Sequence, residues 1–478
     1  MSVKARALQA FRCLGPICLI PLLSAATAIT PLDPVSELLN GPKVTTNLTT
    51  LATMGVPVVA ASADGVTEVV LRASGCTVNE TLTFAVLSAD GQPSTSVPND
   101  GGLFAIGGSP SAAASSLTVK CKSTSAGPFA FAIYLTPVDF NYPGSGNDAN
   151  ASRPVSFSLT GNGSPYTLGF TILRPPVLFV HGLWGAPSSW DDFCNLPENG
   201  SCPVPLGSPF TTYLADYSST NGGSFAQNAQ TVFTQLQQFV SDFKTANNAA
   251  SVQMDTVGHS MGGNVLRTIV GTLSTYRRAA NFDLGDIHKF ISLDTPHLGS
   301  PLATNLKNSG FLCTLLFDSF GYPVAGAITD LSPGSAALKL LSKKVFPITA
   351  SLITGVADSG QSTAALNNYN GLLAVACPNL VPSGGFTQLF GGPNDLIVGL
   401  TSQQGVGLGY TGNTLPVTAE SNLVHTMAAD LITVGPSVLN QNIVNGNTVW
   451  ASTPDPQAVI DQLNTWILTS ASFGAMLP

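Results

Sequence analysis

The pattern of apolar and polar positions divides the chain into two parts. From about residue 30 to 161, short β-prone runs are separated by turns rich in Gly, Pro, Asn and Asp. Such spacing is typical of an antiparallel β-sandwich. We therefore expect a β-sandwich-like accessory domain over residues 29–165. The clearest runs are residues 67–73, 82–91, 116–121 and 128–137, and residues 139–154 read as a long turn-rich loop.

The second part alternates apolar strands with amphipathic helices. Residues 176–182 form a continuous apolar run, which is typical of a strand buried on both faces of a parallel sheet. The alternation predicts an α/β domain over residues 166–478, with a mostly parallel sheet and helices on both faces. The later elements are expected as a helix over 225–243, a strand over 254–260, a helix over 262–273 and a strand-then-loop over 289–300.

The first 28 residues have the features of an export signal. Lys4 and Arg6 form a basic start, residues 14–23 are apolar, and Ala26-Thr27-Ala28 offers a small-residue cleavage site. The apolar run is too short to span a bilayer comfortably, and no later stretch has the length of a spanning helix. We predict a cleaved signal and a secreted or periplasmic protein, with an uncleaved membrane anchor as the alternative.

Export changes the interpretation of the cysteines. An even number of cysteines in an exported chain indicates disulfides. No pair has the Cys-x-x-Cys spacing of a zinc or redox site. Sequence proximity favours the pairs Cys76–Cys121, Cys194–Cys202 and Cys313–Cys377.

Charge identifies no partner. Only 9% of the residues are charged, the net charge is −8, and the chain has no Lys/Arg cluster of the kind that binds nucleic acid. Surface polarity must come from Ser, Thr, Asn and Gly. We expect no nucleic-acid partner.

Residues with chemical potential gather where predicted strands end, which is where α/β sheets bind ligands. Gly258-His259-Ser260-Met261-Gly262 is a Gly-x-Ser-x-Gly segment between a predicted strand and a predicted helix. That context is the one a nucleophile elbow requires, because a sharp turn tolerates no bulk two residues before or after the serine. We predict that Ser260 is a nucleophile; the alternative is a serine in an ordinary tight turn.

A serine nucleophile needs a base, and the base needs an acid to orient it. Of the five histidines, His181 and His259 belong to turns. His288 lies at the start of its strand, away from the carboxyl end where ligands bind. His297 follows that strand directly and leaves little sequence for an acid on a separate strand, so His425 is the predicted base. In the order serine, acid, histidine, Asp395 is the predicted acid and Asp358 the alternative.

Two backbone amides are expected to hold the oxyanion of an acyl-transfer transition state. One belongs to Met261, directly after the nucleophile. The other belongs to Leu183, after His181-Gly182 at the end of the apolar strand. The alternative is that the His-Gly segment is only a structural turn.

The segments "VLFVHGLWG", "VGHSMGG", "LDTPHLGS" and "PNDLIV", followed by His425, resemble the lipase and esterase branch of the α/β-hydrolase superfamily over residues 170–430. The resemblance implies hydrolysis of lipid-like or other apolar esters through an acyl-enzyme, without a cofactor, and with transient contact with a lipid interface. It also implies a helical cap around residues 300–380, where residues 309–341 are rich in Leu, Phe, Gly and Ala; the alternative is an ordinary buried helical layer. No Asp-rich loop assigns the calcium that many bacterial lipases carry, so no metal ligand is predicted.

Two other functions fit the same residues. The triad does not separate a hydrolase from an acyltransferase that passes the acyl group to an alcohol. A binding or adhesion protein with a degenerate hydrolase domain is the third possibility, and the presence of all three triad residue types argues against it.

Overall fold

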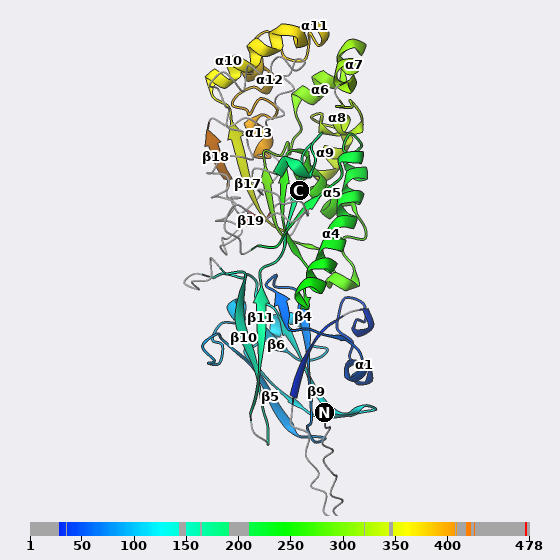
Figure 1. Ribbon diagram of the computed structural model, residues 1–478, viewed down its shortest axis with the longest axis vertical. Helices are drawn as coiled ribbons and strands as arrows, with labels where there is room; N and C mark the ends of the chain where they lie inside the picture. The colour runs from blue at the N-terminus through cyan, green and yellow to red at the C-terminus, as the bar shows by residue number, and fades with distance from the viewer. Residues whose placement is uncertain are drawn as a thin grey trace, which may run out of the picture.

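The structure is a computed structural model with two parts arranged along its long axis (Figure 1). The predicted signal lies outside the described residues, except for Ala28, which begins β1 (Ala28–Asp33). The second predicted disulfide, Cys194–Cys202, also lies outside them. The structure describes residues 28–34, 36–142, 150–162, 165–190, 210–319, 321–343, 348–406, 408, 417–421, 425 and 474–475.

The N-terminal part contains two β-sheets. The first is antiparallel and has the order β2-β1-β4-β9-β6, with β8 beside β9. Each predicted β-run between residues 67 and 137 contains a strand of one sheet or the other. The remaining strands of the first sheet are β2 (Val56–Pro57), β4 (Glu68–Ser74), β6 (Gly102–Phe104), β8 (Lys122–Thr124) and β9 (Gly127–Leu135).

The second sheet is mixed and has the order β14-β3-β11-β10-β5-β7, in which β3 runs parallel to both β11 and β14. β11 follows the boundary expected after residue 165, yet it pairs with β10 from Leu173 to Tyr166. Alternate side chains of both sheets, such as Leu71 and Phe157, are buried in one core. The strands are β3 (Ala60–Ser62), β5 (Thr81–Leu87), β7 (Ser116–Lys120), β10 (Ser152–Thr160), β11 (Tyr166–Leu173) and β14 (Ala249–Ala250).

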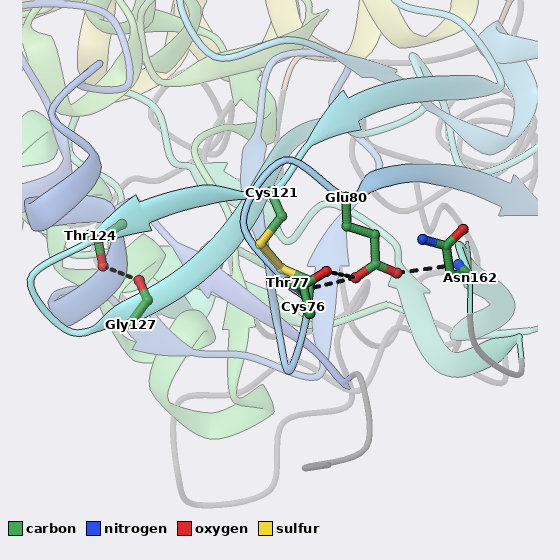
Figure 2. The surroundings of a disulfide bond; sticks show 7 residues. All are labelled: Cys76, Thr77, Glu80, Cys121, Thr124, Gly127 and Asn162. Atoms are coloured by element: carbon green, nitrogen blue, oxygen red, sulfur yellow. Dashed lines mark hydrogen bonds between the residues drawn. A yellow bond between two sulfur atoms is a disulfide. The ribbon is translucent and has the colours of Figure 1, made fainter.

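The predicted disulfide Cys76–Cys121 is present and joins the loop after β4 to the end of β7. Figure 2 shows that Glu80 lies beside it. The Glu80 carboxylate accepts hydrogen bonds from the amide of Thr77 at 2.9 Å and from the amide of Asn162 at 3.2 Å. The carboxylate therefore ties the disulfide loop to the chain after β10.

The C-terminal part is built on a sheet with the order β13-β12-β15-β16-β17-β18. These strands are parallel, and β19 adds an antiparallel partner to β17. The strands are β12 (Val177–Val180), β13 (Thr212–Ala215), β15 (Met254–His259), β16 (Ile287–Leu293), β17 (Thr349–Val356), β18 (Val417–Ser421) and β19 (Gly474–Ala475).

Two helices, α4 (Phe225–Asn247) and α5 (Met261–Thr272), lie together on one side of this sheet (Figure 1). α4 begins after Ser224, whose hydroxyl accepts from the amide of Gln227. It ends at Asn247, because the next residue, Asn248, has a positive φ of 46° in the left-handed region that stops a helix. Its apolar face, which includes Val232 and Leu236, is buried in the core, as the helical spacing predicted.

Short helices flank β17 on both sides in sequence, so this strand divides the range predicted for a helical cap. The predicted disulfide Cys313–Cys377 joins the two groups. Figure 1 shows α7 and α11 near each other at the top of the molecule. The first group is α6 (Pro301–Lys307), α7 (Phe311–Ser319), α8 (Gly326–Leu331) and α9 (Ala336–Leu341), and the second is α10 (Ser359–Asn368), α11 (Ala374–Ala376) and α12 (Gly385–Phe390).

Within the ranges that the structure describes, no helix combines the length and the apolar character needed to cross a bilayer.

Buried polar contacts join the two parts. The Asp64 carboxylate accepts hydrogen bonds from Thr67 in its own loop, with the hydroxyl at 2.6 Å and the amide at 2.8 Å. It also accepts from the amides of Val252 and Gln253, at 3.3 and 3.2 Å, directly before β15. One buried carboxylate thus satisfies backbone donors on both sides of the junction.

Charged side chains add to this junction. Lys289 of β16 forms an ion pair of 2.7 Å with Asp139. The neighbouring His288 bonds to Asp255 at 2.8 Å and to the carbonyl of Val138 at 3.0 Å. Burial alone would lower the pKa of His288, but the adjacent Asp255 carboxylate raises it.

We predict that Asp64→Asn lowers the stability of the whole chain. An amide in place of the carboxylate presents two N–H groups to buried donors, which costs about 3 kcal/mol. Calorimetry should show a lower melting temperature. Asp90→Asn is the matched control, because Asp90 is exposed and accepts one local hydrogen bond from Gln92. Equal melting temperatures for the two variants would contradict the role of Asp64.

Candidate active site

Ser260 lies in the sharp turn between β15 and α5. Its φ is +53°, in the left-handed region that side-chain-bearing residues rarely adopt. The residue is 8% exposed. The strand–turn–helix context expected from the sequence is therefore present.

The glycines around Ser260 allow this turn to lie against the end of β12. A Cβ atom added at Gly262 would lie 2.3 Å from the carbonyl oxygen of Val180, and one added at Gly258 would lie 2.7 Å from backbone atoms of Gly263. Backbone atoms cannot move away as a flexible side chain can. Both positions therefore require glycine, for the steric reason that the motif indicated.

The three predicted triad residues meet at this turn. His425 Nε2 lies 2.7 Å from Ser260 Oγ, and His425 Nδ1 lies 2.7 Å from Asp395 Oδ2. Asp395 and His425 are 0% and 2% exposed. With the imidazole proton on Nδ1, Nδ1–H donates to the carboxylate and Nε2 accepts from the serine hydroxyl. The alternative acid, Asp358, instead caps the N-terminus of α10 and accepts from the amide of Gln361 at 2.7 Å.

The Asp395 carboxylate is held by donors on both oxygens. Oδ1 accepts from the amides of Ile397 and Val398, at 3.0 and 2.6 Å. Oδ2 accepts from Gln403 Nε2 at 3.0 Å as well as from His425. Gln403 is buried at the end of α13 (Leu400–Gln403). Sequence reasoning missed Gln403, because a lone glutamine carries no motif.

The surroundings of His425 raise its pKa. Burial alone would lower the pKa of His425, but the charge and hydrogen bond of Asp395 and the charge of Asp294 together raise it. Its neighbour His259 donates from Nε2 to the carbonyl of His425 at 2.9 Å. Burial, aided by the charge of His425, lowers the pKa of His259 to about 3, so His259 stays neutral.

The backbone of the His181-Gly182-Leu183 segment lies directly against Ser260. A Cβ atom added at Gly182 would lie 2.8 Å from the Cβ and 3.3 Å from the Oγ of Ser260. Leu183 follows at this point, and Met261 begins α5 on the other side of the serine. Gly182, which precedes the predicted Leu183 amide, therefore lies in close contact with Ser260.

A buried asparagine, Asn221, forms two hydrogen bonds with the backbone of this segment. Asn221 Nδ2 donates to the carbonyl of Gly182 at 2.9 Å, and Asn221 Oδ1 accepts from the amide of Trp184. These two contacts fix the peptides on either side of Leu183. Asn228 of α4 in turn donates to the Asn221 carbonyl at 3.1 Å. Asn221 was not singled out from the sequence, because it lies in a polar loop without periodicity.

Trp184 joins the same segment to α7 and to the residues that follow α7. Its ring lies 5.8 Å from that of Phe317 in α7 and 5.3 Å from that of Tyr322, measured between centroids. Its indole N–H donates to the carbonyl of Pro323 at 3.2 Å. The segment predicted as a cap therefore packs next to the turn beside Ser260.

The remaining histidines make contacts that are consistent with structural roles. The ring of His181 stacks on Tyr217 at 4.1 Å, and burial lowers the pKa of His181 to about 4. His297 Nε2 lies 3.1 Å from Ser292 Oγ of β16. His288 belongs to the junction between the two parts, away from Ser260, as its place at the start of its strand indicated.

Comparison with known families agrees with this geometry. Residues 176–317, which include the Ser260 turn, match a family described as "Putative serine esterase (DUF676)". The resemblance to serine esterases is confirmed over these residues. The match supports ester hydrolysis in general. No curated protein matches the chain.

Solved structures give only distant likenesses. Esterase B from Lactobacillus rhamnosis is 14% identical with a TM-score of 0.26, over 47% of this chain and 72% of that one. A fungal esterase from Rhizomucor miehei is 12% identical with a TM-score of 0.25, over 62% and 82%. The cell wall degrading esterase LipA from Xanthomonas oryzae is 11% identical with a TM-score of 0.28, over 79% and 90%. Similarity this low does not establish a shared substrate.

Proposed function

We propose that this protein is a serine carboxylic-ester hydrolase that works through an acyl-enzyme, with Ser260 as nucleophile, His425 as base and Asp395 as acid. The observation that carries the proposal is the continuous contact from Ser260 Oγ through the His425 ring to Asp395, with 2.7 Å at each step. Three residues widely separated in sequence meet in the order that proton transfer requires.

The chemistry follows from these contacts. Ser260 Oγ attacks the ester carbonyl carbon while its proton passes to His425 Nε2. The imidazolium then protonates the leaving alkoxide as the carbon–oxygen bond breaks, and the acyl group stays on Ser260. Water, deprotonated by His425, attacks the acyl carbon. His425 then returns this proton to Ser260 Oγ as the bond between Oγ and the acyl carbon breaks, which releases the acid and restores Ser260. Asp395 remains ionised throughout and stabilises the positive charge on His425.

The amides of Leu183 and Met261 are proposed to bind the oxyanion of each tetrahedral intermediate. The close approach of Gly182 to Ser260 supports this assignment. Asn221 is proposed as the residue that orients the Leu183 amide, because it holds the preceding carbonyl and the following amide. A preorganised donor needs no rearrangement as charge develops, which is the main source of such stabilisation.

The proposed substrates are lipid-like or other apolar esters. α7 exposes Phe311, Leu312 and Leu315, with Phe311 77% exposed, while Cys313 and Phe317 on its other side are buried. The contact of Trp184 with Phe317 brings this helix close to the site. An exposed apolar surface here suits an acyl chain or brief contact with a lipid surface.

Export and domain organisation complete the proposal. The two disulfides are compatible with a secreted protein. We propose that residues 1–28 are removed as a signal. The two N-terminal sheets, which share one core, are proposed to form a β-sandwich-like accessory domain beside the α/β-hydrolase domain.

Ser260→Ala tests the nucleophile. The variant should fold normally and lose several orders of magnitude in kcat, because no other group can form the acyl-enzyme. Mass spectrometry after treatment with a fluorophosphonate should place the adduct on the peptide that contains Ser260. Adding His425→Ala to Ser260→Ala should cause no further loss, since the residues act as a unit. A fully active Ser260→Ala enzyme, or an adduct elsewhere, would refute the assignment.

The pH dependence tests the base. His425 must be neutral to accept the serine proton, and its pKa is raised above the ordinary value of 6.5. Therefore kcat/KM should be full at alkaline pH and fall as the pH drops through a value above 6.5. The measurement is kcat/KM for a p-nitrophenyl ester from about pH 5 to about pH 9. A fall centred well below the ordinary histidine value would be inconsistent with this base.

Phe311→Asp tests the acyl site. Phe311 is highly exposed, so the substitution should leave the fold intact. A charge in the path of an acyl chain must lose hydration, so kcat/KM should fall by at least about tenfold for palmitate esters and little for butyrate esters. Val59→Asp, at an exposed site in the N-terminal part, is the control. Equal losses on both esters would show that α7 supports the fold and does not line the acyl site.

A further inference from the structure

The site contains a second buried carboxylate that the proposed mechanism does not use. Asp294 follows β16 directly and is 0% exposed. Its φ is +47°, in the left-handed region that only glycine, asparagine and aspartate enter with ease. Its backbone amide donates to the carbonyl of Ile353 at 3.0 Å, which anchors this turn to the neighbouring strand β17.

A hydrogen-bonded path joins Asp294 to the proposed acid. Asp294 Oδ1 accepts from the amide of Gly355 at 2.5 Å, and the same amide donates to Gln403 Oε1 at 2.9 Å. Gln403 Nε2 then donates to Asp395 Oδ2. Gly355 and Gln403 therefore hold the two carboxylates in a fixed relation.

Asp294 also lies near the proposed base. One of its carboxylate oxygens, one of Asp395 and a ring nitrogen of His425 all lie within 4.8 Å of one another. The titratable groups that face His425 within the described part of the chain are Asp395, Asp294 and the neutral His259. The charge of Asp294 acts in the same direction as that of Asp395 and favours the protonated form of His425.

We propose that Asp294 is a second positioning acid, which shares with Asp395 the stabilisation of the imidazolium that forms on His425 during acyl transfer. The inference rests on the proposed function. Asp395 makes the direct hydrogen bond and fixes the ring, whereas Asp294 contributes its charge from the adjacent strand end. Two carboxylates would then stabilise the protonated His425, one from the chain between β16 and β17 and the other from the chain between β17 and β18.

The hydrogen bond from the Gly355 amide does not require a charge on Asp294. An asparagine oxygen would accept the Gly355 amide equally well, and asparagine tolerates a positive φ. Burying a carboxylate beside another carboxylate is unfavourable, because the like charges repel in a poorly solvated site. A positively charged His425 offsets that repulsion. The charge of Asp294 can therefore stabilise the imidazolium, which a neutral hydrogen-bond acceptor at this position would do less well.

The decisive variant is Asp294→Asn, which keeps the acceptor and removes the charge. We expect the plateau kcat to fall about tenfold, with KM and the melting temperature nearly unchanged. We also expect the fall of kcat/KM at acidic pH to move down by about one pH unit, because His425 loses part of what favours its protonation. A purely structural role, which asparagine can fill, would leave both kcat and the pH profile unchanged, and that result would overturn the inference.

Asp358→Asn is the matched control. Asp358 also follows a strand of the same sheet, but its carboxylate caps α10 and asparagine is an equally good cap. Its pH profile should match that of the unmodified enzyme. A shift as large as that of Asp294→Asn would show that any lost carboxylate has this effect, and would overturn the inference.

A second experiment tests the inference in a background that lacks Asp395. If Asp294 shares the task, Asp395→Ala should retain at least about tenfold more activity than His425→Ala, and adding Asp294→Asn should remove that remainder. Equal activities of Asp395→Ala and His425→Ala would overturn the inference. The proposed function fails separately, through an active Ser260→Ala variant; an inactive Ser260→Ala with an unchanged pH profile for Asp294→Asn would reject only the second acid.

Discussion

The contact between the end of β12 and the turn at Ser260 is the constraint on which the rest of the site depends. Parallel pairing sets Val180 opposite Gly258, so the two strands end side by side. The carbonyl of Val180 then approaches Gly262 so closely that no side chain fits there. This approach holds Ser260 in a conformation that an isolated peptide would avoid, at a cost of order 1–3 kcal/mol that the surrounding sheet offsets.

Two buried carboxylates, Asp395 and Asp64, are held largely by backbone N–H groups. Asp395 accepts from two amides in its own turn, and Asp64 accepts from amides in both parts of the chain. Each arrangement keeps an ionised side chain in place where water is scarce. Hydrogen bonds from backbone amides therefore hold both the proposed catalytic acid and the carboxylate at the junction directly before β15, the strand that leads to Ser260.

Local patterns predicted the elements well where periodicity was strong. The helix expected over residues 225–243 extends to Asn247, because the left-handed Asn248 and not the last apolar residue ends it. The apolar run at 176–182 contains β12, and the strand expected over residues 254–260 is β15, Met254–His259. β17 was not anticipated within the helical range 300–380, because a buried strand lacks the alternating pattern that would distinguish it from the buried helices around it.

By itself, the sequence determined the alternation of strands and helices, the glycine-flanked turn at Ser260 and a short list of histidines and acids that could serve it. Only the tertiary structure decided that Asp395 and not Asp358 meets His425, and that Gln403, Asn221 and Asp294 surround the site. Asp395, Asn221 and Asp294 lie in loops and Gln403 is the last residue of a four-residue helix, so no periodicity records which way these side chains point. Their meeting depends on the order of strands in the sheet, which is set by packing over the whole domain and not by neighbours in the chain.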